Sequence, residues 1–194
     1  MGDAAPLPGW YNDLESFERA CWRAMARGSA DRRSPFHTPV LASIGLDGCP
    51  EARTIVLRGV DEAERMLRFH SDLRAAKVAA LRRRPDASVL FYDKAAKLQV
   101  RARGRTRIET VEGAVGALAW ERTRSFSRDC YRTEPPPGSP ISSGDGYAQP
   151  EREDDGAEAF GVILVTVYEI EALFLASQGH RRARFAEERT WLVP

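Results

Sequence analysis

The apolar residues of the chain follow two different periods, one typical of helices and the other typical of strands. Helical spacing comes first, over residues 10–27. The apolar stripe of this segment consists of Leu14, Phe17, Cys21 and Met25. Because Asn12 or Asp13 can cap the first turn, the pattern predicts an amphipathic helix.

Strand-like spacing begins near residue 38. Two β-rich runs flank Asp47 and Gly48, a dipeptide that accepts the positive φ angles of a tight turn, so residues 38–58 are predicted to form a hairpin. Further strands are expected over residues 66–71, 87–93, 97–110, 159–177, 179–186 and 190–194.

Two short helices are expected among these strands. The first is predicted over residues 71–86, with Ser71 or Asp72 as its cap. The second is predicted to begin near residue 110 and to end near Trp120. Neither belongs to a regular strand–helix–strand repeat, which argues against a parallel sheet.

The strand pattern is clearest over residues 97–110, where apolar and polar residues alternate strictly. One face carries Leu98, Val100 and Ala102, and the other carries Gln99, Arg101 and Arg103. Such alternation is typical of a strand that is wet on one side. Together the elements predict a mainly β fold with flanking helices, built as an antiparallel barrel.

Residues 134–158 differ from the rest of the chain in composition. They are rich in Pro, Gly, Ser and charged residues, and they hold too little apolar surface to order themselves alone. We expect a mobile loop, or one that a partner orders. The length of 194 residues and the lack of internal repeats predict a single domain over residues 1–194.

Composition disfavours several classes of protein. There are 29 Lys and Arg against 28 Asp and Glu, a formal net charge of +1, so no global field attracts nucleic acid or an anionic membrane. The longest apolar run, residues 160–168, is too short to span a bilayer, and the first ten residues match neither a signal peptide nor a myristoylation site. The glycine-rich phosphate loops of nucleotide-binding folds are absent.

Cysteine and histidine usage predicts no metal site. The three cysteines form no CxxC pair, which disfavours a disulfide framework and fits a reducing cytoplasm. His37 and His70 have no partner at metal-ligand spacing.

The segment RTIVLRG, residues 53–59, places a cation near each end of a strand-like apolar run. Alternation assigns one face to Arg53, Ile55 and Leu57 and the other to Thr54, Val56 and Arg58. These cations could hold an anion. The ordinary alternative is that both are solvated ends of an edge strand, with their aliphatic stems on apolar neighbours.

Other polar residues strengthen the anion hypothesis. Ser71 stands where a strand passes into a helix, a place where free backbone N–H groups bind anions, and Lys77 follows about one turn later. Together with Arg53 they can hold a dianionic phosphate, although each alone is explained by a plain helix cap or a solvated side chain. Gln99 can bind the edge of a heterocycle or simply lie on a polar surface.

The segment GHRRARF near the C-terminus is strongly basic. It holds His180, Arg181, Arg182 and Arg184. Charges this close repel one another unless an anion or an acidic partner offsets them. A solvated basic turn is the ordinary alternative.

Taken in order, the segments RTIVLRG, FHSDLRAAKVAAL, PDASVLFYD, LQVRARG and GHRRARF resemble the pyridoxamine 5'-phosphate oxidase-like family of FMN-binding split barrels. The likeness spans residues 38–194 except for the loop. It implies a six-stranded antiparallel split β-barrel, a homodimer, FMN in a cleft built by both subunits, and a small-molecule substrate.

The resemblance also implies residue roles. The residues implied to bind FMN from one subunit are Arg53, Thr54, Ile55, Val56, Leu57, Arg58, His70, Ser71, Lys77 and Gln99. Among them, Arg53 and Lys77 would grip the phosphate, and Gln99 would contact the isoalloxazine from the same subunit. Arg184 would come from the second subunit.

Departures from the family pattern concern the substrate. Genuine pyridoxamine phosphate oxidases clasp the substrate phosphate with a tyrosine and an arginine on the helix after the glutamine strand, where this chain has Phe126 and Arg122. Arg58 stands where a substrate-facing lysine is usual, Ala76 removes one cation of an Arg–Lys pair, and Ala183 lies near the place of a histidine. The substrate contacts that the resemblance implies are Arg58, Arg122 and Arg181.

These departures favour an FMN-dependent oxidoreductase that acts on a substrate other than pyridoxamine 5'-phosphate. Two alternatives stay open. One is the genuine oxidase, which forms pyridoxal 5'-phosphate while reducing O₂ to H₂O₂, and the other is a non-catalytic flavin-binding or sensor protein. A nucleic-acid binder is least favoured, because the balanced charge offers no broad basic face.

Overall fold

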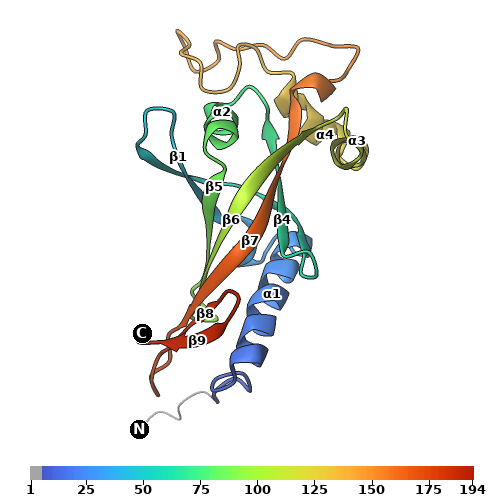
Figure 1. Cartoon of the computed structure of the whole chain (residues 1–194). Helices are drawn as coiled ribbons and strands as arrows, with labels where there is room; N and C mark the ends of the chain where they lie inside the picture. Colours follow the sequence, from blue (N-terminus) through green and yellow to red (C-terminus); the bar gives the residue numbers. More distant parts are fainter. Residues whose placement is uncertain (1–5) are drawn as a thin grey trace.

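The computed structural model describes residues 6–194, and one antiparallel sheet of nine strands dominates that range (Figure 1). The strands are β1 (Val40–Ile44), β2 (Pro50–Thr54), β3 (Leu57–Asp61), β4 (Met66–Asp72), β5 (Asp86–Asp93), β6 (Leu98–Thr110), β7 (Phe160–Phe174), β8 (Arg181–Phe185) and β9 (Arg189–Leu192). Seven of them pair in the order β2-β1-β5-β6-β7-β4-β3, while β8 pairs with β7 and β9. The predicted mainly β, antiparallel fold is confirmed, with nine strands instead of six.

Helices flank the sheet. The α-helices are α1 (Leu14–Ala30), α2 (Ala76–Arg83), α3 (Ala114–Glu121) and α4 (Ser125–Arg128), and the short 3-10 helices are η1 (Pro35–His37), η2 (Asp129–Tyr131) and η3 (Ala157–Ala159). Asp13 caps α1, because its carboxylate accepts a hydrogen bond of 2.8 Å from the Ser16 N–H. The helix continues past the predicted end, because Gly28 packs against Phe36 so closely that a Cβ there would lie 2.7 Å from the Phe36 backbone.

The RTIVLRG segment is not one strand, contrary to the alternation prediction. Strand β2 ends at Thr54 and β3 begins at Leu57, and these two strands lie at opposite ends of the seven-strand path. Only Ile55 and Val56 connect them, so the sheet must curve until its two edges meet. No ladder pairs β2 with β3 in the described range, and the barrel is therefore open.

The predicted cap of the second helix is wrong. Ser71 and Asp72 remain in β4, where they pair with Gly161 and Phe160 of β7. Helix α2 begins later, at Ala76, and no side chain caps it. The ladder to β7 holds both residues in extended conformation, so the first helical turn forms only after it.

Two hydrophobic clusters hold the layers together. The larger cluster lies between α1 and the curved sheet, and its largest fully buried side chains include Phe17, Trp22, Phe69, Phe91 and Phe185. The smaller cluster packs α3 against β7 and consists of Ala119, Phe160, Val162 and Leu164. Gly116 allows this approach, since a Cβ there would lie 1.9 Å from the Thr110 carbonyl oxygen.

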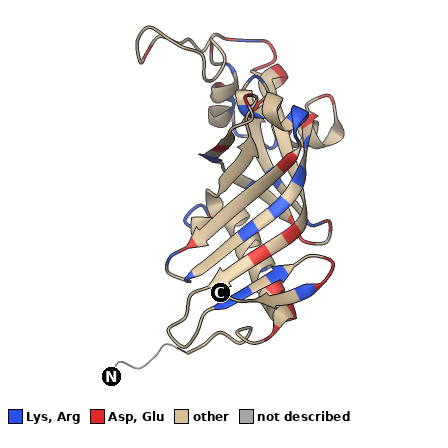
Figure 2. Ribbon diagram, turned by 60° about the vertical axis from the view of Figure 1, so that its left-hand side comes forward, with Lys and Arg blue, Asp and Glu red and all other residues tan. Residues whose placement is uncertain are grey.

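The outer face of β6 is charged, as the alternation predicts (Figure 2). Arg101 and Arg103 point outward and pair with acids of β7. Arg101 Nη2 lies 2.7 Å from a carboxylate oxygen of Glu171, and Arg103 Nη1 lies 3.2 Å from one of Glu169. These arginines are therefore neutralised within the chain.

Residues 134–158 follow an irregular path at one end of the sheet (Figure 1). Arg152 ties the base of this loop, with carboxylate oxygens of Asp154, Glu158 and Glu134 at 2.9, 3.1 and 3.7 Å. Its mobility stays a prediction. Among residues 6–194, no helix is both long and apolar enough to cross a membrane.

Candidate functional site

The first part of the site lies where α2 begins beside the ends of β2 and β4. Lys77, in the first turn of α2, is partly buried, and its pKa is lowered by burial and then by the charge of Arg53, while Asp72 opposes the shift. Within residues 6–194 the Lys77 ammonium has no hydrogen bond or ion pair. A partly buried cation without a partner, next to an uncapped helix N-terminus, is a natural place for an anion.

Arg53 is held rigidly beside this lysine. Its Nη1 donates hydrogen bonds to Ser43 Oγ at 2.7 Å and to the Leu41 carbonyl oxygen at 3.3 Å, and its Nη2 pairs with Glu51. Ser71 is buried, and its hydroxyl donates to the Asp72 carbonyl oxygen at 3.1 Å. We call the region around Arg53, Lys77 and the end of β4 the phosphate end.

Gln99 lies at different levels of the sheet relative to Ser71 and to Arg53. Ser71 pairs with Gly161, which pairs with Thr110, and Gln99 is eleven residues before Thr110 on β6, roughly 36 Å along the strand. Arg53 instead pairs with Leu41, Leu41 with Val89 and Val89 with Ala102, which is three residues from Gln99. The expectation that Gln99 joins the phosphate residues of its own subunit stays a prediction.

Arg184 shares the end of the sheet on which Gln99 lies. It pairs across the ladder with Glu171, which pairs with Arg101, two residues from Gln99. Arg184 is exposed, and neither its guanidinium nor the Gln99 amide has a hydrogen-bond partner in the described range. Gln99 and Arg184 thus lie at the end of the β6–β7 ladder opposite to Ser71.

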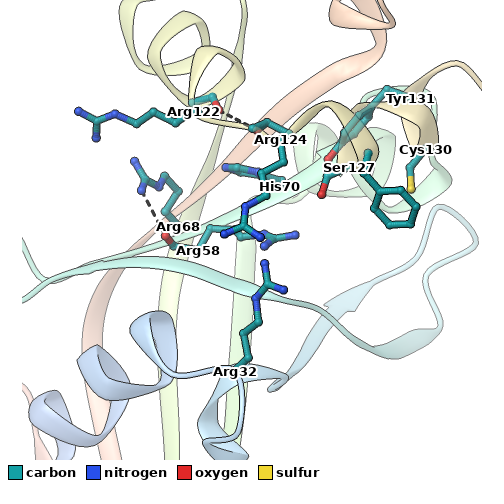
Figure 3. A pocket seen from close by; sticks show the side chains of 12 residues that line it. Arg32, Arg58, Arg68, His70, Arg122, Arg124, Ser127, Cys130 and Tyr131 are labelled. Carbon is teal, nitrogen blue, oxygen red and sulfur yellow. Dashed lines mark hydrogen bonds between the residues drawn. The ribbon is translucent and has the colours of Figure 1, made fainter.

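A pocket of about 360 Å³ opens next to the phosphate end (Figure 3). The five arginines that line it are Arg32, Arg58, Arg68, Arg122 and Arg124. His70 lines it too, and the next residue, Ser71, belongs to the phosphate end. We call this region the arginine pocket.

Strand irregularity positions Arg58 and Arg68. The β3–β4 register shifts between Leu57 and Gly59, so Arg58 sits at a bulge, a feature that redirects a side chain. Arg68 Nη2 donates to the Arg58 carbonyl oxygen at 3.2 Å. Gly59 makes room for this guanidinium, because a Cβ there would lie 3.0 Å from Arg68 Nε.

Aromatic packing positions the other wall of the pocket. Phe160 contacts the rings of Trp120 and Tyr131, each at 5.1 Å between centroids. Arg128 lies over the Trp120 ring at 4.5 Å and donates to the Trp120 carbonyl oxygen at 3.1 Å. This cluster fixes the segment that carries Arg122 and Arg124.

His70 and Tyr131 contribute neutral polar groups to the pocket. Burial lowers the pKa of His70 to about 3, assisted by the charges of Arg58 and Arg68. Its Nε2 is buried without a hydrogen-bond partner within residues 6–194, and its ring meets Phe160 edge-on at 4.8 Å. Burial also raises the pKa of Tyr131 to about 12. The charge of the pocket therefore comes from its arginines.

The arginines of the pocket are unpaired. The side chains of Arg32, Arg58, Arg122 and Arg124 have no hydrogen bond or carboxylate partner in the described part of the chain, and Arg68 Nε is buried without one. No carboxylate lines the pocket. Other arginines of the chain, such as Arg101 and Arg182, are paired with an acid, in their case Glu171. The unpaired cations indicate a binding site for an anion.

Several predicted contacts lie outside this pocket. Arg181 does not reach it, because its Nε and Nη2 donate to Asn12 Oδ1 at 3.0 and 2.9 Å and its guanidinium lies 3.9 Å from the Tyr11 ring centroid. Ile55 and Leu57 are buried in the main core. Only their backbone remains available to a cofactor.

The other two residues of this stretch are more accessible. Thr54 is exposed at the end of β2. Val56 lines a hollow beside Arg58.

Sequence reasoning found Arg58, His70, Arg122 and Phe126 but missed the pocket's other arginines and Tyr131. Arg68 could have been found, because it stands two residues before His70 on β4 and so shares its face. No sequence pattern around Arg32 or Tyr131 predicts a place in this pocket. Arg32 follows the end of α1 and Tyr131 ends η2, and only the fold brings them together. No group of three potential metal ligands occurs in residues 6–194.

The fold and the two adjoining anion sites define an open antiparallel barrel suited to a phosphorylated cofactor and an anionic substrate. A family profile described as "Pyridoxamine 5'-phosphate oxidase, FMN-binding domain" matches residues 19–110. Residues 19–110 therefore match the FMN-binding domain of the pyridoxamine 5'-phosphate oxidase family, as the sequence motifs predict, and FMN is the cofactor of that domain.

Curated relatives carry the same family name. The chain is 28% identical over 132 residues to pyridoxine/pyridoxamine 5'-phosphate oxidase 2 of Arabidopsis thaliana, covering 64% of this chain and 67% of that protein. It is 33% identical over 141 residues to pyridoxine/pyridoxamine 5'-phosphate oxidase of Burkholderia cenocepacia, covering 73% of this chain but 54% of that protein. The alignment thus spans only about half the length of the bacterial relative.

Solved structures confirm the fold. A pyridoxamine 5'-phosphate oxidase-related, FMN-binding protein from Nostoc punctiforme superimposes with a TM-score of 0.73 at 22% identity, covering 97% of this chain and 100% of that chain. PhzG from Burkholderia lata, in complex with tetrahydrophenazine-1-carboxylic acid, gives a TM-score of 0.69 at 20% identity and covers both chains fully. At this identity the likeness concerns the split-barrel fold alone.

Proposed function

We propose that this chain is an FMN-dependent oxidoreductase whose substrate is an organic anion other than pyridoxamine 5'-phosphate. The observation that carries the proposal is the arginine pocket, which holds five arginines and no carboxylate and adjoins the phosphate end through His70 and Ser71. FMN, when bound, supplies the capacity to take up or release a hydride or electrons. The residues of the chain bind and orient the reactants.

The phosphate end fits the cofactor phosphate. Lys77 is partly buried and unpaired, and a dianion beside it would offset the cost of its burial. Arg53 is already oriented by Ser43 and Glu51, so it adds charge without losing further freedom. The free N–H groups at the start of α2 complete the donor set.

The flavin ring requires residues from a second chain. Ser71 pairs with Gly161 and Arg184 with Glu171, so ten residues of β7, roughly 33 Å, lie between these two predicted FMN contacts of one chain. Two copies related by a two-fold axis would bring each phosphate end to the other copy's Arg184. We therefore propose a homodimer with two composite FMN sites.

Within the proposed site, each polar group has a defined task. Arginine side chains hold the acidic part of the substrate through charge-assisted hydrogen bonds. His70 stays neutral at physiological pH, so its imidazole can offer a hydrogen bond without adding charge. The surrounding aromatic wall, Trp120 and Tyr131, limits the entry of water.

One observation favours the genuine pyridoxamine phosphate oxidase as a second candidate. Tyr131 and Arg122 both line the arginine pocket, and Ser127 lies beside them. The pocket thus holds a tyrosine and an arginine, even though Phe126 replaces the tyrosine expected from sequence. Phe126 itself is 84% exposed.

The test begins with the absorbance spectrum of the purified protein and chromatographic identification of any released flavin. FMN should be found, or should bind when added. Peroxide formation from pyridoxamine 5'-phosphate then separates the two candidates, and we expect little or none. A protein that neither contains nor binds FMN would refute both, whereas rapid turnover of pyridoxamine 5'-phosphate would establish the second.

A further inference from the structure

The five cations of the arginine pocket fall into two groups. Arg32, Arg58 and Arg124 also line a second hollow, of about 650 Å³, to which neither Arg68 nor Arg122 contributes. Figure 3 shows these three side chains pointing toward one another. They come from the turn after α1, from the β3 bulge and from the α3–α4 connection, so the tertiary fold alone assembles them.

The second group consists of Arg68 and Arg122. The Arg122 charge, after burial, lowers the pKa of Arg68, which places the two guanidinium groups close to each other. Arg68 also lines a hollow together with Asp61 and Leu118, and the first group does not contribute to this hollow. Figure 3 shows Arg68 and Arg122 directed to the other side of the pocket.

His70 lies between the two groups. Its imidazole interacts with the charge of Arg58, from the first group, and of Arg68, from the second. Its buried Nε2 has no hydrogen-bond partner in residues 6–194. A ligand that contacts both groups of arginines therefore lies beside His70, whose Nε2 is neutral and has no hydrogen-bond partner in that range.

We propose that the arginine pocket binds a substrate with two separate acidic groups, one held by Arg68 and Arg122 and the other by Arg32, Arg58 and Arg124. This inference rests on the proposed function and specifies its substrate class. The body of the substrate between the two acids lies beside His70. A rigid body between the two acids fits best, because it fixes their separation and lets both groups be reached at once.

The arrangement of the guanidinium groups, and not their total charge, supports two acids over one. A phosphate and a dicarboxylate both carry about two negative charges, but only the dicarboxylate presents them at two separate places. Unpaired guanidinium groups in two places each match the bidentate geometry of a carboxylate or phosphate. Lys77 and Arg53, to which the proposed function assigns the cofactor phosphate, do not line this pocket.

The experiment measures binding of matched acids to the FMN-loaded protein by calorimetry in a phosphate-free buffer. The probes are benzoate, benzene-1,3-dicarboxylate and naphthalene-2,6-dicarboxylate, so that one acid is compared with two acids at two separations. We expect at least one diacid to bind ten or more times more tightly than benzoate. If neither diacid exceeds benzoate by more than about twofold, the proposal is wrong.

Variants from each group sharpen this test. Arg122→Gln and Arg124→Gln should each weaken diacid binding by about tenfold while leaving benzoate within about threefold, because benzoate can use the intact group. Arg101→Gln, on the outer face of β6, is the matched control. It should change neither the affinity for the diacid nor the affinity for benzoate. Loss confined to Arg122→Gln would indicate one anion subsite and would overturn the proposal.

The same measurements separate this inference from the proposed function. If the protein binds FMN but binds mono-acids and diacids equally well, the proposed function stands and the two-acid inference is wrong. If the protein does not bind FMN, the proposed function is wrong, and the diacid measurements on the FMN-free protein still test the two-acid pocket.

Discussion

Ser71 and Gln99 lie at opposite ends of the β4–β7–β6 ladder. Ser71 pairs with Gly161, which pairs with Thr110, and eleven residues of β6 separate Thr110 from Gln99. Ser71 and Arg184 are likewise ten residues apart along β7, through their partners Gly161 and Glu171. The proposed homodimer would join the phosphate end of one copy to Arg184 of the other.

This relationship predicts complementation between two defective variants. Lys77→Met damages the phosphate end, and Arg184→Gln damages the opposite end. Each homodimer should bind FMN poorly, but a one-to-one mixture that exchanges subunits should restore about a quarter of all sites, since half the dimers are mixed and each mixed dimer has one intact site. Flavin fluorescence quenching on mixing measures the recovery, and a mixture no better than its components would contradict the composite site.

Lys77→Met should by itself weaken FMN binding about 10- to 100-fold, because it removes a charge-assisted hydrogen bond to the phosphate. Riboflavin, which has no phosphate, should bind the variant and the unaltered protein equally. Arg101→Gln serves as the control on a solvated, internally paired face. Equal losses for FMN and riboflavin would show that Lys77 does not contact the phosphate.

FMN should stabilise the folded protein by mass action. At a hundredfold excess over Kd the gain is about 2.7 kcal/mol, which corresponds to a rise in Tm of roughly 5–10 °C for a chain of this length. Thermal unfolding followed by far-UV circular dichroism, with and without FMN, measures it. A Tm that does not respond to FMN would contradict a site within the folded structure.

His70 should make stability depend on pH. Its pKa is about 3 in the folded protein against about 6.5 in the unfolded chain, so below pH 6.5 the unfolded state binds the additional proton. Protonation therefore favours unfolding, and the loss grows as the pH falls from 6.5 toward 3. Relative to pH 8, the cost at pH 5 is about 2 kcal/mol.

Urea unfolding of the FMN-free protein measures this pH dependence. A His70→Asn variant should lack the corresponding slope, while the carboxylates and the other two histidines titrate equally in both proteins. Parallel curves for the two proteins between pH 8 and pH 5 would exclude a buried neutral His70.

Gly116 should tolerate no side chain, because a Cβ would lie 1.9 Å from the Thr110 carbonyl oxygen. Gly116→Ala is expected to cost about 1–3 kcal/mol of unfolding free energy, since α3 must move away from β6. Gly144→Ala, where nothing lies within 4 Å, should stay within about 0.5 kcal/mol. Urea unfolding of both variants checks the contrast, and equal stability of the two would show that α3 is not packed this closely.

Much of the local structure follows from the sequence alone. The apolar stripe of α1, the Asp47–Gly48 turn and the alternation of β6 each depend on the fixed period of a helix or strand, which neighbouring residues determine. The ordered motifs that carry Arg53, Lys77 and Gln99 indicated the family for the same reason, because they are read along the chain.

Only the tertiary structure decided how those motifs meet. The break at Ile55 and Val56, the separation of Ser71 from Gln99, and the meeting of Arg32 with Arg124 depend on which strands pair and how the sheet curves. Strand pairing and burial bring together residues that are distant along the chain. The local periodicity of the sequence does not predict which of these residues meet. The sequence by itself thus determined the elements and the cofactor family, whereas long-range pairing decided that Ser71 and Gln99 lie at opposite ends of one ladder and that five arginines share one pocket.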